Sequence, residues 1–172
     1  MDSNITILGR PEKLASDTSK VIDTVRYFFD IGGKDYDQIW LALPTCPLRT
    51  RTDVEMAQAL LTPDIDGVVS ITDYEFPPTL GLQKEHGDLI HDWLAEEPYQ
   101  NDNTRSQDHP PIYRPNGALY GMWCKSFAKY RNFFKGKTRG YYMPRERSVD
   151  IDTELDLKVA ETLLKESYND KV

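Results

Sequence analysis

Residues 39–71 read IWLALPTCPLRTRTDVEMAQALLTPDIDGVVSI, and this stretch decides the fold. The short apolar run over 39–43 is typical of a strand that is buried on both faces. Thr52 with Glu55 predicts a capping box that opens a helix, and the run over 67–71 predicts a second buried strand. Strand, helix and strand in this order indicate an α/β domain with a largely parallel sheet.

Further elements are predicted on both sides of this stretch. A helix is expected to begin at residues 16–18, because apolar residues recur at helical spacing as far as Phe29. Strands are expected at 118–120 and 141–143, and a closing helix at 153–168. The buried sides of that closing helix are expected to carry six apolar residues: Leu155, Val159, Leu163, Leu157, Ala160 and Leu164.

Residues 77–113 interrupt the alternation of strands and helices. Prolines and a turn signal at 86–88, with apolar residues on either side, predict a β-hairpin followed by a polar loop over 96–107. Such an excursion is a poor core element and a good candidate for contact between subunits. The whole chain, residues 1–172, is expected to form a single domain that includes this arm.

Composition narrows the class of protein. The net charge is −7 without any run of Lys and Arg, which argues against nucleic acid or an anionic membrane as the main partner. No apolar run approaches the ~18 residues of a membrane span, and the N-terminus does not resemble a signal peptide. The two cysteines are far apart, which predicts reduced thiols in the cytoplasm. The three histidines do not cluster, so a zinc site is not expected.

The segment 141–156 carries the clearest chemical signal. Asp150 and Asp152 are two apart just before the closing helix, and in an extended segment both would point to the same face. Paired carboxylates of this kind can hold Mg²⁺, which then usually also touches a substrate phosphate. Alternatively, the segment only caps the helix, since Thr153 and Asp156 have the spacing of a capping box. A cap and a metal ligand can coexist.

Five islands along the chain carry a resemblance to a known family. They are RPEKLASDT at 10–18, LPTCPLRT at 43–50, YRPNGALY at 113–120, FF at 133–134 and MPRERSVDIDTELD at 143–156. Their order and spacing resemble the acylneuraminate cytidylyltransferases, or CMP-sialic acid synthetases, a group that includes relatives acting on legionaminic and pseudaminic acids. The resemblance covers residues 8–166, and its last island is the most specific.

The resemblance implies a reaction, a fold and a set of site residues. The family couples CTP to a nine-carbon 2-keto sugar acid (a nonulosonic acid), releases pyrophosphate and uses Mg²⁺. The implied fold is α/β, a three-layer, Rossmann-like domain of the nucleotide-diphospho-sugar transferase type with a mixed sheet. The arm at 77–113 matches the segment that subunits exchange in the family's homodimer. The implied residues are Asp150 and Asp152 for catalysis and metal, with Arg10, Asn116, Tyr120, Phe133 and Phe134 for substrate.

Each implied role has a structural alternative. Tyr120 and the Phe133–Phe134 pair can be ordinary core, and Arg10 can be a solvated charge. The Asn116-Gly117 dipeptide can simply be a turn. Arg145 and Arg147 can be surface charges or can face phosphates.

The chain also departs from the family pattern. The family begins with an apolar strand and a phosphate-binding loop, and nothing comparable is found here, so the chain is expected to lack the N-terminal phosphate-loop region. Leu43 and Cys46 replace a usual Gln and Ser; Val21 and Gln83 stand where Ser and Lys are expected; an Arg-Gln pair reads Ser106-Gln107. A sugar hydroxyl left unpaired in a buried pocket costs ~1–3 kcal/mol, so these changes indicate a different sugar or no turnover.

Three interpretations follow from these observations. The chain is a nucleotidyltransferase of the CMP-nonulosonate synthetase type, working with a separate N-terminal half or beginning further upstream. It is alternatively a non-catalytic sugar-binding remnant of that family, or an assembly module without a ligand. The retained acid pair favours the first interpretation, and the missing loop favours the second. Activity of this chain alone is not expected.

Overall fold

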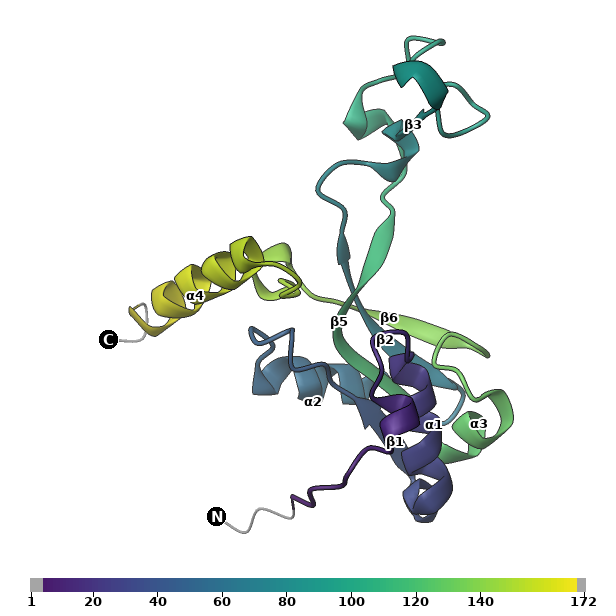
Figure 1. Ribbon diagram of the computed structural model, residues 1–172, viewed down its shortest axis with the longest axis vertical. Helices are drawn as coiled ribbons and strands as arrows, with labels where there is room; N and C mark the ends of the chain where they lie inside the picture. The colour runs from purple at the N-terminus through teal and green to yellow at the C-terminus, as the bar shows by residue number, and fades with distance from the viewer. Residues whose placement is uncertain (1–4, 170–172) are drawn as a thin grey trace.

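The computed structural model describes residues 5–169 and is built on a mixed four-stranded sheet in the order β1-β5-β2-β6 (Figure 1). The strands of this sheet are β1 (Gln38–Leu41), β2 (Gly67–Asp73), β5 (Tyr113–Trp123) and β6 (Thr138–Tyr142). A separate antiparallel pair consists of β3 (Leu82–Lys84) and β4 (Ile90–Asp92). The helices are α1 (Val21–Ile31), α2 (Arg51–Ala59), α3 (Cys124–Tyr130) and α4 (Glu154–Asn169). The α/β class and the mixed sheet are therefore confirmed.

Strand directions correct the expectation of a largely parallel sheet. Only β2 and β6 pair in parallel, whereas β5 runs antiparallel to both β1 and β2. The reason is connectivity: the chain leaves β2, passes through residues 77–112 and returns beside the same strand as β5. Because β5 alone is reversed, the carboxyl ends of β1, β2 and β6 still meet at one edge of the sheet.

Two apolar clusters lie on opposite faces of the sheet and make the domain three-layered. Val68 packs with Ala57 and Leu61 on the α2 side, and its neighbour Val69 packs with residues of α1 and α3. This division follows from the alternation of side chains along a strand. On the second face the rings of Phe29 and Phe127 join α1 to α3, with centroids 5.0 Å apart.

Both early helices begin at positions other than those predicted. Helix α1 begins at Val21 because Ser16 and Ser19 hydrogen-bond each other (2.8 Å), and their backbones close a turn of their own. Helix α2 begins at Arg51, and its capping box is Thr50 with Asp53 instead of Thr52 with Glu55. Short polar residues compete for the backbone at several neighbouring positions, and packing selects among them.

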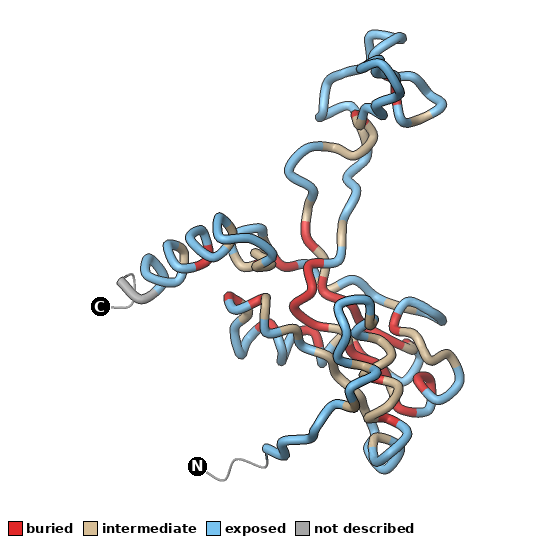
Figure 2. The backbone as a smooth tube through the Cα atoms, viewed as in Figure 1, coloured by how far each residue is buried: buried red, intermediate tan, exposed pale blue. Residues whose placement is uncertain are grey.

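The arm rises from the edge of the sheet as an extension that is mostly exposed (Figures 1 and 2). In it, β3 pairs with β4 around the turn His86–Asp88, where Gly87 has a φ of 80°. Two further 3₁₀ turns lie in the arm, Pro78–Leu80 and Ser106–Asp108, and another, Arg145–Arg147, follows β6. The remaining two are Glu12–Leu14 and Gly33–Asp35. The predicted role of the arm in dimerisation stays a prediction.

Two elements are less buried than predicted. Strand β1 is only half-buried, since it is one of the two edge strands of the sheet. Helix α4 buries Ala160, but Leu155 is 69% exposed and the other apolar side chains are half-buried or exposed. The exposed ones on α4 are Leu155, Leu157, Val159 and Leu164. Within the described residues, no helix is long and apolar enough to cross a membrane.

Candidate metal and substrate groove

A groove of about 940 Å³ lies beyond the carboxyl ends of β2 and β6. Its walls are the residues that leave β2, the segment 145–152 and the first turns of α4. Asp150 and Asp152 both line it, so the structure brings together the two acids singled out from the sequence. Ligands of α/β domains commonly bind at this edge of the sheet, which makes the groove the candidate site.

Asp150 is half-buried and packs against the loop that follows β1. The backbone N–H of Ile151 donates to the Thr45 carbonyl (2.9 Å), which ties the segment to that loop. The Cys46 thiol donates to the Asn116 carbonyl (3.2 Å) and lies 3.5 Å from Asp150 Oδ1. Gly117, with φ of 79°, has no side chain there; a Cβ would lie 2.8 Å from Cys46 Sγ.

Cys46 is fully buried, and its thiol stays protonated. Burial raises the pKa of Cys46 to about 11, and the neighbouring Asp150 carboxylate adds to this effect. A protonated thiol is a poor metal ligand and a poor nucleophile. Oxygen atoms are therefore the available donors at this end of the groove.

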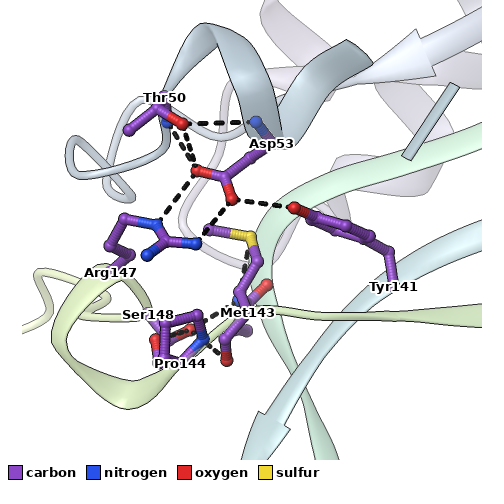
Figure 3. A network of polar contacts seen from close by, with 8 residues as sticks. Thr50, Asp53, Tyr141, Met143, Pro144, Arg147 and Ser148 are labelled. Atoms are coloured by element: carbon purple, nitrogen blue, oxygen red, sulfur yellow. Dashed lines mark hydrogen bonds and ion pairs between the residues drawn. The ribbon is translucent and has the colours of Figure 1, made fainter. Parts of the chain in front are cut away.

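An ion pair between the buried Asp53 and the half-buried Arg147 holds the turn that precedes Asp150 (Figure 3). Asp53 is 1% exposed and accepts from Arg147 Nε (3.2 Å) and Nη2 (3.0 Å). It also accepts from the backbone N–H of Thr50 (2.7 Å) and from the Tyr141 hydroxyl (2.9 Å). Burial acts to raise the pKa of Asp53, but the hydrogen bonds from Arg147, Thr50 and Tyr141 outweigh it and hold that pKa below its usual value. Arg147 thus has a structural partner instead of a free guanidinium.

Asn116 is buried at the centre of a second network, which joins β2, β5 and the same segment. Its Oδ1 accepts from Ser70 Oγ (2.5 Å) and from the Ala118 N–H (3.1 Å). Its Nδ2 donates to Ser148 Oγ (2.8 Å) and contacts Met143 Sδ (3.4 Å). Because both ends of the amide are occupied within the protein, the geometry favours a positioning role for this predicted substrate-binding residue.

Asp152 is exposed at the start of α4, beside a capping box. The N–H of Thr153 donates to Asp156 Oδ2 (2.8 Å), and the Asp156 N–H donates to Thr153 Oγ1 (3.3 Å). The predicted cap is therefore present. It leaves the Asp152 carboxylate available, so capping and metal binding are compatible in this segment.

The predicted aromatic residues occupy different environments. The Tyr120 ring lies 5.9 Å from the rings of both Phe133 and Phe134. Phe133 is a core residue with 3% exposure, whereas Phe134 is 59% exposed. Burial, followed by the nearby Cys46 and Asp150, raises the pKa of Tyr120. Arg10 is exposed and does not line the groove.

The donor set fits a magnesium ion that shares its ligands with a substrate. Among the described residues, no group of three or more His, Cys, Asp or Glu is arranged to hold a metal. Asp150 and Asp152 offer two hard carboxylates at one groove. Mg²⁺ is commonly held by one or two carboxylates, with water and substrate phosphates as its other ligands.

Sequence reasoning missed Asp53, Ser70 and Ser148. Only Asp53 had a local signal, as the third residue after Thr50 in a capping box. The partners of Asp53 and Asn116 are far away in sequence, at separations of 94 residues for Arg147 and 46 for Ser70.

Known proteins are similar to this chain over most of its length. N-acylneuraminate cytidylyltransferase of Streptococcus agalactiae is 28% identical over 158 residues, which are 91% of this chain and 37% of that protein. CMP-N,N'-diacetyllegionaminic acid synthase of Legionella pneumophila is 30% identical over 162 residues, 90% of this chain and 67% of that protein. The chain belongs to the acylneuraminate cytidylyltransferase family. The family predicted from the sequence is thereby confirmed.

Further comparisons show how much of the chain and of its relatives is similar. Pseudaminic acid cytidylyltransferase of Campylobacter jejuni is 25% identical over 134 residues, 77% of this chain and 56% of that protein. No protein-family model matches the chain. The chain spans little more than a third of the Streptococcus agalactiae cytidylyltransferase, at 37% of its length.

Proposed function

We propose that this chain supplies the metal-binding groove for the transfer of CMP from CTP to a nonulosonic acid. The single observation that supports this proposal best is the presence of Asp150 and Asp152 on one groove, in a chain of this family. In the proposed reaction, the anomeric hydroxyl of the sugar attacks the α-phosphorus of CTP. The bond to the β-phosphate breaks, pyrophosphate leaves and the hydroxyl proton is released.

The two carboxylates would hold Mg²⁺ from one side of the groove. Bound there, the ion would supply positive charge next to the reacting phosphates, which is its usual contribution to such transfers. The protein positions Asp150 through the Ile151–Thr45 hydrogen bond and through the ion pair of Asp53 with Arg147. Asp152 is fixed by the first turn of α4, where its N–H faces Asp156 Oδ2 at 3.3 Å.

The remaining predicted residues are assigned more indirect roles in this proposal. Neither Tyr120 nor Phe134 lines the groove, but Tyr120 is close enough to Asp150 that this carboxylate adds to the effect of burial in raising the pKa of Tyr120, and the Phe134 ring lies 5.9 Å from that of Tyr120. A sugar ring that extends beyond the groove can pack on this aromatic surface. Asn116 acts by fixing Ser148 and β5, and Phe133 supports the ring of Tyr120. Arg10 contributes to nucleotide binding only if the nucleotide extends beyond the groove. We further propose that the protein works as a homodimer.

Metal binding gives the first test. Binding of Mn²⁺, followed by the loss of its free electron-paramagnetic-resonance signal, is expected for the intact chain and strongly weakened in Asp150→Ala/Asp152→Ala. Asp17→Ala is the control, since it removes an exposed carboxylate far from the groove in sequence. Equal Mn²⁺ affinity in the double variant and the intact chain would contradict the assignment of these two acids.

Calorimetric titration of Mg·CTP into the chain gives the second test. Binding, followed by release of pyrophosphate when N-acetylneuraminate is added, is expected if this chain holds the phosphates itself. Binding of the sugar acid without any binding of CTP would instead support a sugar-binding protein that lacks the transfer reaction. A separate chain that restores CTP binding would identify the complementing half.

A further inference from the structure

The groove beside Asp150 is lined by more negative than positive side chains. Six carboxylates and two guanidinium groups line it. Arg145 is already paired with Glu75 across the groove. Arg114 is different: among the side chains that the structure describes, no carboxylate lies within 4.0 Å of its guanidinium. Its hydrogen bond is from Nη1 to the Pro115 carbonyl at 3.5 Å, the weak limit for such a contact.

The backbone that carries Arg114 is well anchored. Arg114 lies opposite Thr72 in the β2–β5 ladder and two residues before Asn116. Asn116 in turn hydrogen-bonds Ser148, on the segment that carries Asp150. Arg114, Ser148 and Asp150 all line the groove, so a half-buried arginine without an ion pair shares it with the proposed metal ligands.

An anionic substrate can bind in this groove only where positive charge offsets the carboxylates that line the groove. The sources are a divalent cation on Asp150 and Asp152 and the one groove-lining guanidinium without an ion pair in the described part of the chain. Guanidinium binds carboxylate or phosphate oxygens in pairs, with a geometry that a lysine does not reproduce. We propose that Arg114 is the oxyanion-binding residue of the groove and that it binds substrate jointly with the divalent cation.

This inference rests on the proposed function for the identity of the anion and adds a coupling to it. A bound divalent cation lowers the repulsion from the groove carboxylates, so it strengthens the binding of an anion next to Arg114. By linkage, the anion strengthens the binding of the cation by the same factor. The shared chemistry is an oxyanion, which can be the carboxylate of a sugar acid or the phosphate of a nucleotide.

Three anions distinguish these sources: N-acetylneuraminate, CMP and pyrophosphate, each titrated by calorimetry with and without Mg²⁺. In Arg114→Met, affinity for the anion that contacts Arg114 is expected to fall about tenfold or more, because hydrogen bonds between charged groups are among the strongest in proteins. Loss confined to the sugar acid identifies the carboxylate, and loss for CMP or pyrophosphate identifies a phosphate. Arg114→Lys is expected to recover only part of the affinity.

Arg139→Met is the matched control, because Arg139 is exposed on β6 outside the groove and donates to the Leu60 carbonyl. It removes the same charge, so its anion affinities are expected to stay near those of the intact chain. Unchanged affinities in Arg114→Met, with an unchanged melting temperature, would overturn the inference. An intact chain that binds none of the anions would overturn it too, whereas Mn²⁺ binding by Asp150 and Asp152 tests the proposed function separately.

Discussion

At the scale of single residues, Asp53 makes the most polar contacts that hold the site, and its partners Arg147 and Tyr141 are far away in sequence. Replacing it by Asn leaves Arg147 without its anionic partner inside the protein. Because Arg147 is 37% exposed and stays partly solvated, the loss is that of hydrogen bonds to a charged group, about 1.5–3 kcal/mol. For a chain of this size, Asp53→Asn is expected to lower the melting temperature by about 3–12 °C, measured by circular dichroism at pH 7. A shift no larger than that of Asp17→Asn would contradict the importance of the pair.

The same carboxylate predicts how stability depends on pH. The pKa of Asp53 is lowered in the folded state, so its ionised form stabilises the fold above the unfolded value of about 4. This stabilisation is lost as the pH falls from there through the lowered pKa. The difference in unfolding free energy between the intact chain and Asp53→Asn is therefore expected to shrink toward acid pH. A difference that stays constant between pH 7 and pH 2 would show that the charge of Asp53 does not contribute.

Gly117 is a second residue whose role depends on its surroundings. The Asn116-Gly117 pair was open to interpretation as a simple turn, but it lies within β5, with φ of 79° at Gly117. In Gly117→Ala, positive φ costs about 1–2 kcal/mol, and the new Cβ would lie 3.3 Å from Asp150 Oδ2. The variant is expected to be less stable and to bind Mn²⁺ more weakly. Gly9→Ala, where a Cβ meets nothing within 4 Å, is the control and should change neither property.

At the scale of elements, the spacing of apolar residues predicted the positions of helices and strands well. It predicted less well how deeply each element is buried. The apolar spacing of α4 predicted a helix, yet Leu155 and Val159 are 69% and 42% exposed. A helical repeat shows which residues share a face, but burial depends on what packs against that face. The reversal of β5 was equally hidden, since the alternation of strands and helices does not specify a return through an arm. Of the residues at the site, the sequence identified those that are close to each other along the chain, such as Asp150 and Asp152.

The first turn of α4 offers a test at this scale. Thr153→Ala removes the hydroxyl that accepts from the Asp156 N–H, which costs about 1 kcal/mol at a helix N-terminus. We expect faster amide hydrogen exchange in that turn and weaker Mn²⁺ binding through Asp152. Thr162→Ala is the matched control within the same helix, where the hydroxyl donates to the Lys158 carbonyl and alanine is a good helix former. Equal exchange in both variants would show that the cap does not order this segment.

At the scale of the whole molecule, the arm carries several large apolar side chains that are exposed. Leu89, Ile90 and Trp93 are 66%, 63% and 58% exposed, although they lie on or beside a short antiparallel pair. A soluble protein rarely leaves neighbouring large apolar residues in water unless another surface covers them. Composition alone suggested a subunit contact here, and the structure adds that the arm stands away from the sheet (Figure 2). A second copy of the chain is the partner that we expect.

Analytical ultracentrifugation tests this expectation directly. Deletion of residues 77–113 is expected to turn a dimer into a monomer, but it also joins β2 directly to β5. Leu89→Ser/Ile90→Ser is therefore the sharper variant, because both side chains are exposed and their loss leaves the domain core intact. Val54→Ser/Met56→Ser on α2 is the control, since these residues are 39% and 55% exposed away from the arm. Dimers that persist in the arm variant, or an intact chain that sediments as a monomer, would show that the arm does not join two copies.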